Sequence, residues 1–156
     1  MNDGALVIGV GNRMRRDDGA GPAVLDILAA RGIEITEVAG DCARLIELWD
    51  GRGAVHVVDA MRSGQMAGTV ARLDALGETI PRDNFLNTSH VFGVAEAVET
   101  GRLLGRLPQG LIVWGIEGIA FDNGASLTPA VAVAVAEVAN QLAQELAGAP
   151  AEPAHA

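Results

Sequence analysis

Two carboxylates and one imidazole stand where they can act together. Asp18 follows the first apolar segment, Asp59 ends a later one, and His90 precedes a helical pattern. Carboxylate and imidazole groups are donors for borderline divalent metals such as zinc and nickel. A metal held in this way polarises a peptide carbonyl or lowers the pKa of a bound water. The three residues therefore suggest a site for metal-assisted hydrolysis.

Each of these residues also has a plainer interpretation. Asp17 or Asp18 can cap a helix that begins near Gly21, because acidic side chains before a helix accept hydrogen bonds from its first amides. Asp59 can accept hydrogen bonds from loop amides, and His90 can simply begin a helix. Spacing alone leaves the metal site and these structural roles both open.

Two other residues with reactive side chains are less convincing. His56 lies inside an apolar strand pattern, so we expect a packed histidine. Cys42 is the only cysteine, and a thiol nucleophile acting with His90 is conceivable. A lone cysteine near a helix start is more often just a small residue, and we favour that interpretation.

The pair Gly9 and Gly11 invites comparison with a dinucleotide-binding loop. Met14 stands where the third glycine of that fingerprint belongs, and the next helix starts too late. We therefore reject that interpretation. The glycines are instead expected to permit a tight turn that brings Asn12 and residues 13–18 over the edge of a sheet.

The segments that must position these residues alternate between strand and helix patterns. Continuous apolar runs, typical of strands buried on both faces, cover residues 5–10, 54–60 and 111–116. Further strands are expected over residues 33–38 and 69–74. Helices are expected from Gly21 to Gly32, after Asp41, over residues 91–104 with Thr88 or Ser89 as the cap, and from Thr128-Pro129 onward.

This order predicts an α/β three-layer sandwich, with a mostly parallel five-stranded sheet and helices on both faces. Ligands bind such sheets beyond the carboxyl ends of the strands, so Asp18, Asp59 and His90 are expected at one edge. We expect one domain over residues 1–148, followed by a disordered tail over 149–156.

Composition limits the partners and the compartment. The 156 residues include 20 acidic side chains, 11 arginines and no lysine, for a formal charge of −9. The absence of lysine excludes Schiff-base chemistry and a phosphate-binding P-loop lysine. The acidic balance argues against nucleic acid and against a basic membrane-surface helix. With one cysteine and no apolar segment long enough for a signal or a membrane span, we expect a cytoplasmic protein.

Four motifs together resemble those of the nickel-iron hydrogenase maturation proteases. An apolar strand leads into Gly9-Val10-Gly11-Asn12 and then Asp17-Asp18-Gly19, and a second apolar strand ends in Asp59-Ala60. Thr88-Ser89-His90 precedes a helix, and Gly115-Ile116-Glu117 is followed by residues 127–131. The resemblance extends over about residues 5–146.

The resemblance implies a processing endopeptidase that removes a C-terminal extension from the nickel-loaded [NiFe] hydrogenase large-subunit precursor. It assigns the catalytic and metal-contacting positions to Asp18, Asp59 and His90; the first of these is often Glu in relatives. The nickel is expected to arrive with the precursor, without a permanent cofactor. The precursor is the expected partner, with no nucleic acid or membrane, and the protein is expected to be a monomer or a weak homo-oligomer.

One departure and two alternatives accompany this hypothesis. Many relatives have an Asp-Gly-Gly type of turn where this chain has Gly40-Asp41-Cys42-Ala43, which leaves the substrate preference open. A peptidyl-tRNA hydrolase-like enzyme is one alternative, although Arg13-Met14 replaces the Pro-Gly that family places after Asn12, and tyrosine is absent. The other alternative is a non-catalytic hydrogenase assembly chaperone.

Overall fold

A five-stranded sheet runs through the molecule, as shown by a computed structural model that describes residues 4–81 and 93–148. The strand order is β2-β1-β3-β5-β4, and only the β4–β5 pair is antiparallel. The strands are β1 (Leu6–Val10), β2 (Ile35–Val38), β3 (Ala54–Met61), β4 (Val70–Asp74) and β5 (Gly110–Glu117). The expected mostly parallel sheet is therefore confirmed.

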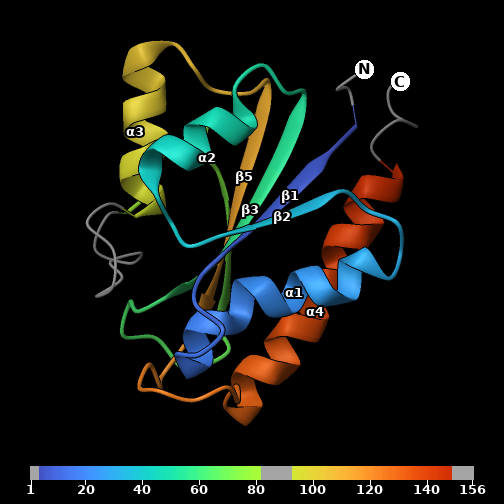
Figure 1. Cartoon of the computed structure of the whole chain (residues 1–156), viewed down its shortest axis with the longest axis vertical. Helices are drawn as coiled ribbons and strands as arrows, with labels where there is room; N and C mark the ends of the chain where they lie inside the picture. The colour runs from blue at the N-terminus through green and yellow to red at the C-terminus, as the bar shows by residue number, and fades with distance from the viewer. Residues whose placement is uncertain (1–3, 82–92, 149–156) are drawn as a thin grey trace.

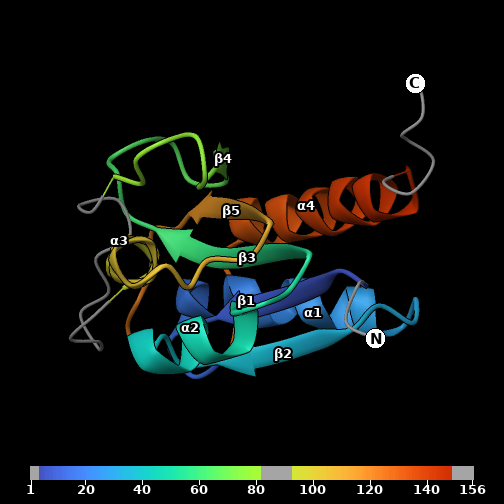
Figure 2. The same cartoon turned by 90° about the horizontal axis from the view of Figure 1, so that it is seen from above.

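Helices cover both faces of this sheet (Figure 1). Helices α2 (Cys42–Trp49) and α3 (Val94–Leu104) pack on one face, and α1 (Ala20–Ala29) and α4 (Pro129–Gly148) pack on the other. A short 3-10 helix, η1 (Arg16–Gly19), precedes α1. Figure 2, which views the fold from above, shows the same three layers and confirms the sandwich architecture.

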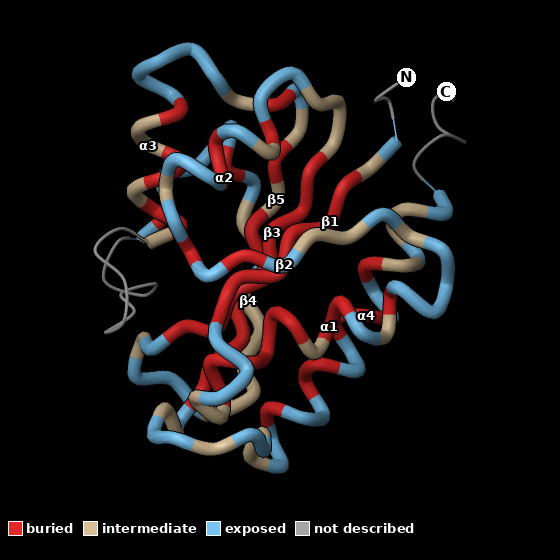
Figure 3. Tube along the Cα trace, viewed as in Figure 1, coloured by how far each residue is buried: buried red, intermediate tan, exposed pale blue. Residues whose placement is uncertain are grey.

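The apolar runs are continuous because both faces of the central strands are covered. Ile8 of β1 lies in the core beneath α2 and α3, whereas its neighbour Val7 lies in the core beneath α1 and α4. Val57 and Val58 of β3 divide between the two cores in the same way. Figure 3 shows the central strands as an almost unbroken buried band.

Two glycines let helix and turn approach the strands closely. A Cβ atom on Gly21 of α1 would lie 2.5 Å from the carbonyl oxygen of Val58 and 2.6 Å from that of Val10. Gly11 has φ +144°, and a Cβ there would overlap the carbonyl oxygen of Asp18. The tight turn that the sequence predicts after β1 is therefore confirmed.

Two of the expected helix caps are wrong. The N-cap of α1 is Gly19, so neither Asp17 nor Asp18 caps that helix. Helix α3 begins at Val94 with Gly93 at its N-cap, where the amide of Gly93 donates to Glu96 at 3.1 Å. Thr88 and Ser89 lie outside the described residues. Asp41 does cap α2, as expected, by accepting from the amide of Ala43.

The single domain expected over residues 1–148 remains a prediction, and the tail over residues 149–156 lies outside the described residues. None of the helices in the described ranges is both long and apolar enough to span a bilayer.

Candidate functional site

Three loops meet beyond the carboxyl ends of the parallel strands, at the lower end of the sheet in Figure 1. They follow β1, β3 and β5, and cover residues 11–15, 62–69 and 118–128. Backbone hydrogen bonds join the third loop to the first loop and to the end of β3. The amide of Gly118 donates to Met61 at 3.0 Å, and the amide of Gly124 donates to Met14 at 2.9 Å.

Four buried carboxylates are concentrated at this edge. Asp17, Asp18, Asp59 and Glu117 expose only 0%, 1%, 2% and 2% of their surface. Acidic side chains are rarely so deeply buried unless they are paired, because removing a charge from water is costly. What surrounds each of them therefore indicates what it does.

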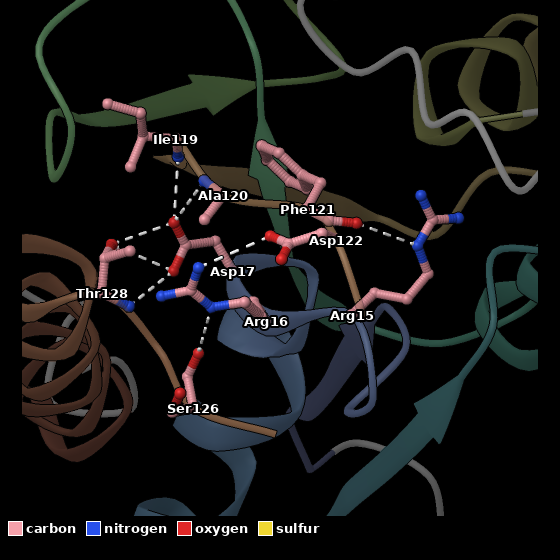
Figure 4. Close-up of polar contacts among 9 residues, drawn as sticks. All are labelled: Arg15, Arg16, Asp17, Ile119, Ala120, Phe121, Asp122, Ser126 and Thr128. Atoms are coloured by element: carbon pink, nitrogen blue, oxygen red, sulfur yellow. Dashed lines mark hydrogen bonds and ion pairs between the residues drawn. The ribbon is translucent and has the colours of Figure 1, made fainter. Parts of the chain in front are cut away.

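Asp17 anchors the β5–α4 loop. Its carboxylate accepts hydrogen bonds from the amides of Ile119 at 2.9 Å, Ala120 at 3.0 Å and Thr128 at 2.8 Å (Figure 4). The hydroxyl of Thr128 donates to it as well, at 2.9 Å. Burial raises the pKa of Asp17, but these hydrogen bonds outweigh burial and hold it below its ordinary value. The burial of Asp17 is thus explained by the loop.

Glu117 has a similar role in the β3–β4 loop. It accepts from the amide of Ser63 at 3.0 Å, from the Ser63 hydroxyl at 2.5 Å and from the amide of Gly64 at 3.2 Å. These contacts satisfy a buried carboxylate at the end of β5. Asp17 and Glu117 together hold two of the three loops in place.

Asp18 and Asp59 form the remaining pair. Asp18 accepts from the amide of Asn12 at 2.9 Å. Asp59 pairs in the sheet with Gly115, a residue without a side chain. Its Oδ1 atom is buried and accepts no hydrogen bond from any described residue.

The electrostatics of the pair are unfavourable for two anions. Burial and the negative charge of Asp18 raise the pKa of Asp59 well above its ordinary value, and a hydrogen bond from the amide of Ala60 opposes this only in part. A cation beside the two carboxylates would relieve both the desolvation and the repulsion. The chemistry that fits this arrangement is carboxylate coordination of a metal ion.

The structure thus places two of the three predicted site residues at one edge of the sheet. The third, His90, lies outside the described residues. Within residues 4–81 and 93–148, no three His, Cys, Asp or Glu side chains form a metal-binding group. At this edge, the described residues that remain as candidate metal ligands are Asp18 and Asp59, through their carboxylates.

Of the two other reactive residues, His56 is packed in the interior. His56 is 6% exposed, and its Nδ1 accepts from the indole of Trp114 at 3.0 Å. Burial lowers the pKa of His56 to about 4, so the expectation of a packed histidine is confirmed. Cys42 is the first residue of α2 and lines a hollow of about 390 Å³ together with Thr100 and Leu104 of α3.

Sequence reasoning missed two features of the site. One is the anchoring role of Asp17, whose partner Thr128 is 111 positions away. The other is a set of exposed apolar side chains in the three loops, which we name the apolar rim: Met14, Met66 and Ile119, with exposed fractions of 61%, 83% and 69%. In the sequence the rim is visible only as apolar residues within loops that also contain glycines and polar residues.

Comparison with protein families gives a match over much of the chain. Residues 39–145, more than half of the chain, match the family model described as hydrogenase maturation protease. The match includes Asp59 and His90 and begins after Asp18. No curated protein sequence gives a significant match.

Solved structures share the fold over nearly the whole chain. The hydrogenase maturating endopeptidase HybD from E. coli is 22% identical, with a TM-score of 0.77, and the alignment covers 94% of this chain and 93% of that one. The [NiFe] hydrogenase maturation protease HybD from Thermococcus kodakarensis is 24% identical, with a TM-score of 0.68 and coverage of 92% and 99%. The endopeptidase HycI from E. coli is 22% identical, with a TM-score of 0.69 and coverage of 91% and 90%.

Proposed function

Because the chain belongs to the hydrogenase maturation protease family, we propose that it removes the C-terminal extension from a [NiFe] hydrogenase large-subunit precursor. The observation that carries the proposal is the unsatisfied Oδ1 of Asp59, buried beside a second carboxylate at the carboxyl edge of the sheet. An endopeptidase of this family needs a catalytic site, and among the four buried acids at this edge Asp59 is the one with a side-chain oxygen that accepts no hydrogen bond from the described residues. Family membership also displaces the peptidyl-tRNA hydrolase alternative.

We assign the contacts with the precursor's nickel to Asp18, Asp59 and His90. Two buried carboxylates that repel each other favour a divalent cation between them. A histidine as the third donor gives the mixed oxygen and nitrogen ligand set that a borderline metal accepts. In this proposal the nickel is part of the substrate. When bound there, this metal ion would polarise a peptide carbonyl or lower the pKa of a bound water.

The apolar rim offers a protein substrate contact area beside the proposed site. Met14, Met66 and Ile119 are exposed, and one of them lies in each of the loops that follow β1, β3 and β5. Exposed apolar side chains of this kind add contact area when they are covered by a partner protein. We therefore propose that the precursor contacts the rim when its scissile bond lies near Asp18 and Asp59. A cytoplasmic location, a monomeric or weakly self-associating state and the absence of nucleic-acid and membrane partners remain predictions.

The proposal is tested by incubating the purified protein with nickel-loaded precursor and measuring the precursor's mass. We expect the mass of the C-terminal extension to disappear with the wild-type protein and to be retained with Asp18→Asn or Asp59→Asn. Glu137→Gln, at an exposed position of α4, removes one negative charge far from the chemistry and should leave cutting unchanged. A stable complex with uncut precursor would instead identify the protein as an assembly chaperone and refute the proposal.

A further inference from the structure

Asp17 and Asp18 are adjacent buried acids that engage different parts of the molecule. The carboxylate of Asp18 accepts from Asn12, on its own side of the β1–η1 turn. The carboxylate of Asp17 reaches across to the β5–α4 loop and accepts from Ile119, Ala120 and Thr128 (Figure 4). Asp18 therefore belongs to the proposed site, whereas its neighbour Asp17 binds the β5–α4 loop.

The backbone around Asp17 is held by the same loop. The amide of Asp17 donates to the carbonyl of Ala120 at 2.9 Å, and the amide of Arg16 donates to that of Gly124 at 2.8 Å. Arg16 has φ +48°, a conformation that non-glycine residues adopt only where their surroundings impose it. The turn that carries Asp18 thus depends on the β5–α4 loop for its shape.

The fit between the turn and the loop is close enough to fix the backbone. A Cβ atom on Gly118 would lie 2.9 Å from the Cβ of Asp17, so the loop has little room to slide against η1. On the other side of the turn, the carbonyl of Asp18 lies against Gly11. A shift of Asp17 therefore moves the peptide that carries Asp18.

We propose that Asp17 is a positioning residue for peptide cleavage: by binding Ile119, Ala120 and Thr128, it sets the location of the Asp18 carboxylate. This inference rests on the proposed function. Asp17 touches neither substrate nor metal, and it acts only through the turn. A displacement of about 1 Å at a catalytic group can reduce a rate on the order of 100-fold, so the effect should be large.

The first test is Asp17→Asn, which has nearly the shape of Asp but places an amide NH2 toward backbone N–H donors. With nickel-loaded precursor, we expect kcat to fall by about 10- to 100-fold while KM stays within about twofold of wild type. The control is Val138→Ala in the core between α1 and α4, which also destabilises the fold but lies away from the turn. Both variants are assayed well below their unfolding temperatures, and Val138→Ala should keep the wild-type kcat.

A second pair of variants tests the same contact without touching Asp17. Thr128→Val removes the hydroxyl donor, whereas Thr128→Ser retains it, so kcat should fall in the first variant and be preserved in the second. If Asp17→Asn and Thr128→Val cut at the rate of Val138→Ala, the positioning role is refuted, although the proposed function stands. If the wild-type protein does not cut the precursor at all, the proposed function fails, and with it any role of Asp17 in that reaction.

Discussion

The buried carboxylate of Asp59 should make the metal-free protein less stable than its uncharged variant. Its Oδ1 accepts no hydrogen bond from the described residues, and burial and Asp18 raise its pKa well above the ordinary value. Asp59→Asn has the same shape and no charge. We therefore expect the variant to be more stable than the wild type at neutral pH, although it should not process precursor.

The magnitude follows from proton linkage. In the unfolded chain Asp59 ionises near its ordinary pKa of 3.8, whereas in the folded protein it keeps its proton to higher pH. The folded state thus binds more protons in this window, and its stability decreases with pH by about 1.4 kcal/mol per unit. This loss begins near the unfolded pKa and continues up to the raised folded pKa. Asparagine does not titrate, so two pH units within the window widen the difference by about 3 kcal/mol, or roughly 6–12 °C in Tm for a chain of this size.

The assay is thermal unfolding of both proteins at pH 4, 5 and 6 in the presence of a chelator. Glu137→Gln, an exposed variant with the same change of formal charge, is the control and should show no such pH-dependent difference. A variant less stable than wild type at pH 6, or a difference that stays constant from pH 4 to pH 6, would refute the account of Asp59 as a destabilising buried acid.

Three further predictions concern the frame of the site and its rim. Gly21→Ala places a Cβ atom 2.5 Å from the carbonyl oxygen of Val58. This clash should lower the free energy of unfolding by about 2 kcal/mol or more, as measured by urea unfolding. Gly148→Ala, also helical but with open space around it, should be neutral or slightly stabilising. Met66→Ser should raise the KM for precursor several-fold. Leu103→Ser, at an equally exposed position on α3, is the control and should leave the KM unchanged. If the two variants have equal KM values, the precursor does not contact the rim. Asp17→Asn should lower the free energy of unfolding by about 2–4 kcal/mol at pH 7, because charged hydrogen bonds are lost. The folded structure lowers the pKa of Asp17, so the difference in stability between variant and wild type should fade in denaturation curves as the pH falls below about 4.

Local pattern was enough to predict most of the fold. Continuous apolar runs gave β1, β3 and β5, and Thr128-Pro129 correctly marked the start of α4. These signals succeed because burial on both faces and helix initiation each depend on residues close together in the chain.

The hydrogen-bond partners of the four buried acids could not be predicted from residue types and spacing. The resemblance assigned a metal contact to Asp18, but the local pattern does not distinguish it from its neighbour Asp17; the folded β5–α4 loop does so, by giving Asp17 its hydrogen bonds from Ile119 and Thr128. The sequence pattern placed Glu117 and Asp59 alike at strand ends, yet in the structure Ser63 donates to Glu117, whereas Oδ1 of Asp59 accepts no hydrogen bond from the described residues. Such differences come from tertiary contacts that no local pattern encodes.

The strand order has a consequence for how this scaffold can diversify. From β1 the chain moves outward through α1 to β2, then returns on the opposite face through α2 to β3 on the other side of β1. The two connections leave on opposite faces of the sheet, which makes the place between β1 and β3 a topological switch point, where ligands bind in open α/β sheets. Asp18 follows β1 and Asp59 lies in β3, so these two acids come from the segments that flank the switch point. The loops over residues 62–69 and 118–128 can therefore change in length to suit another precursor while the switch point itself stays in place.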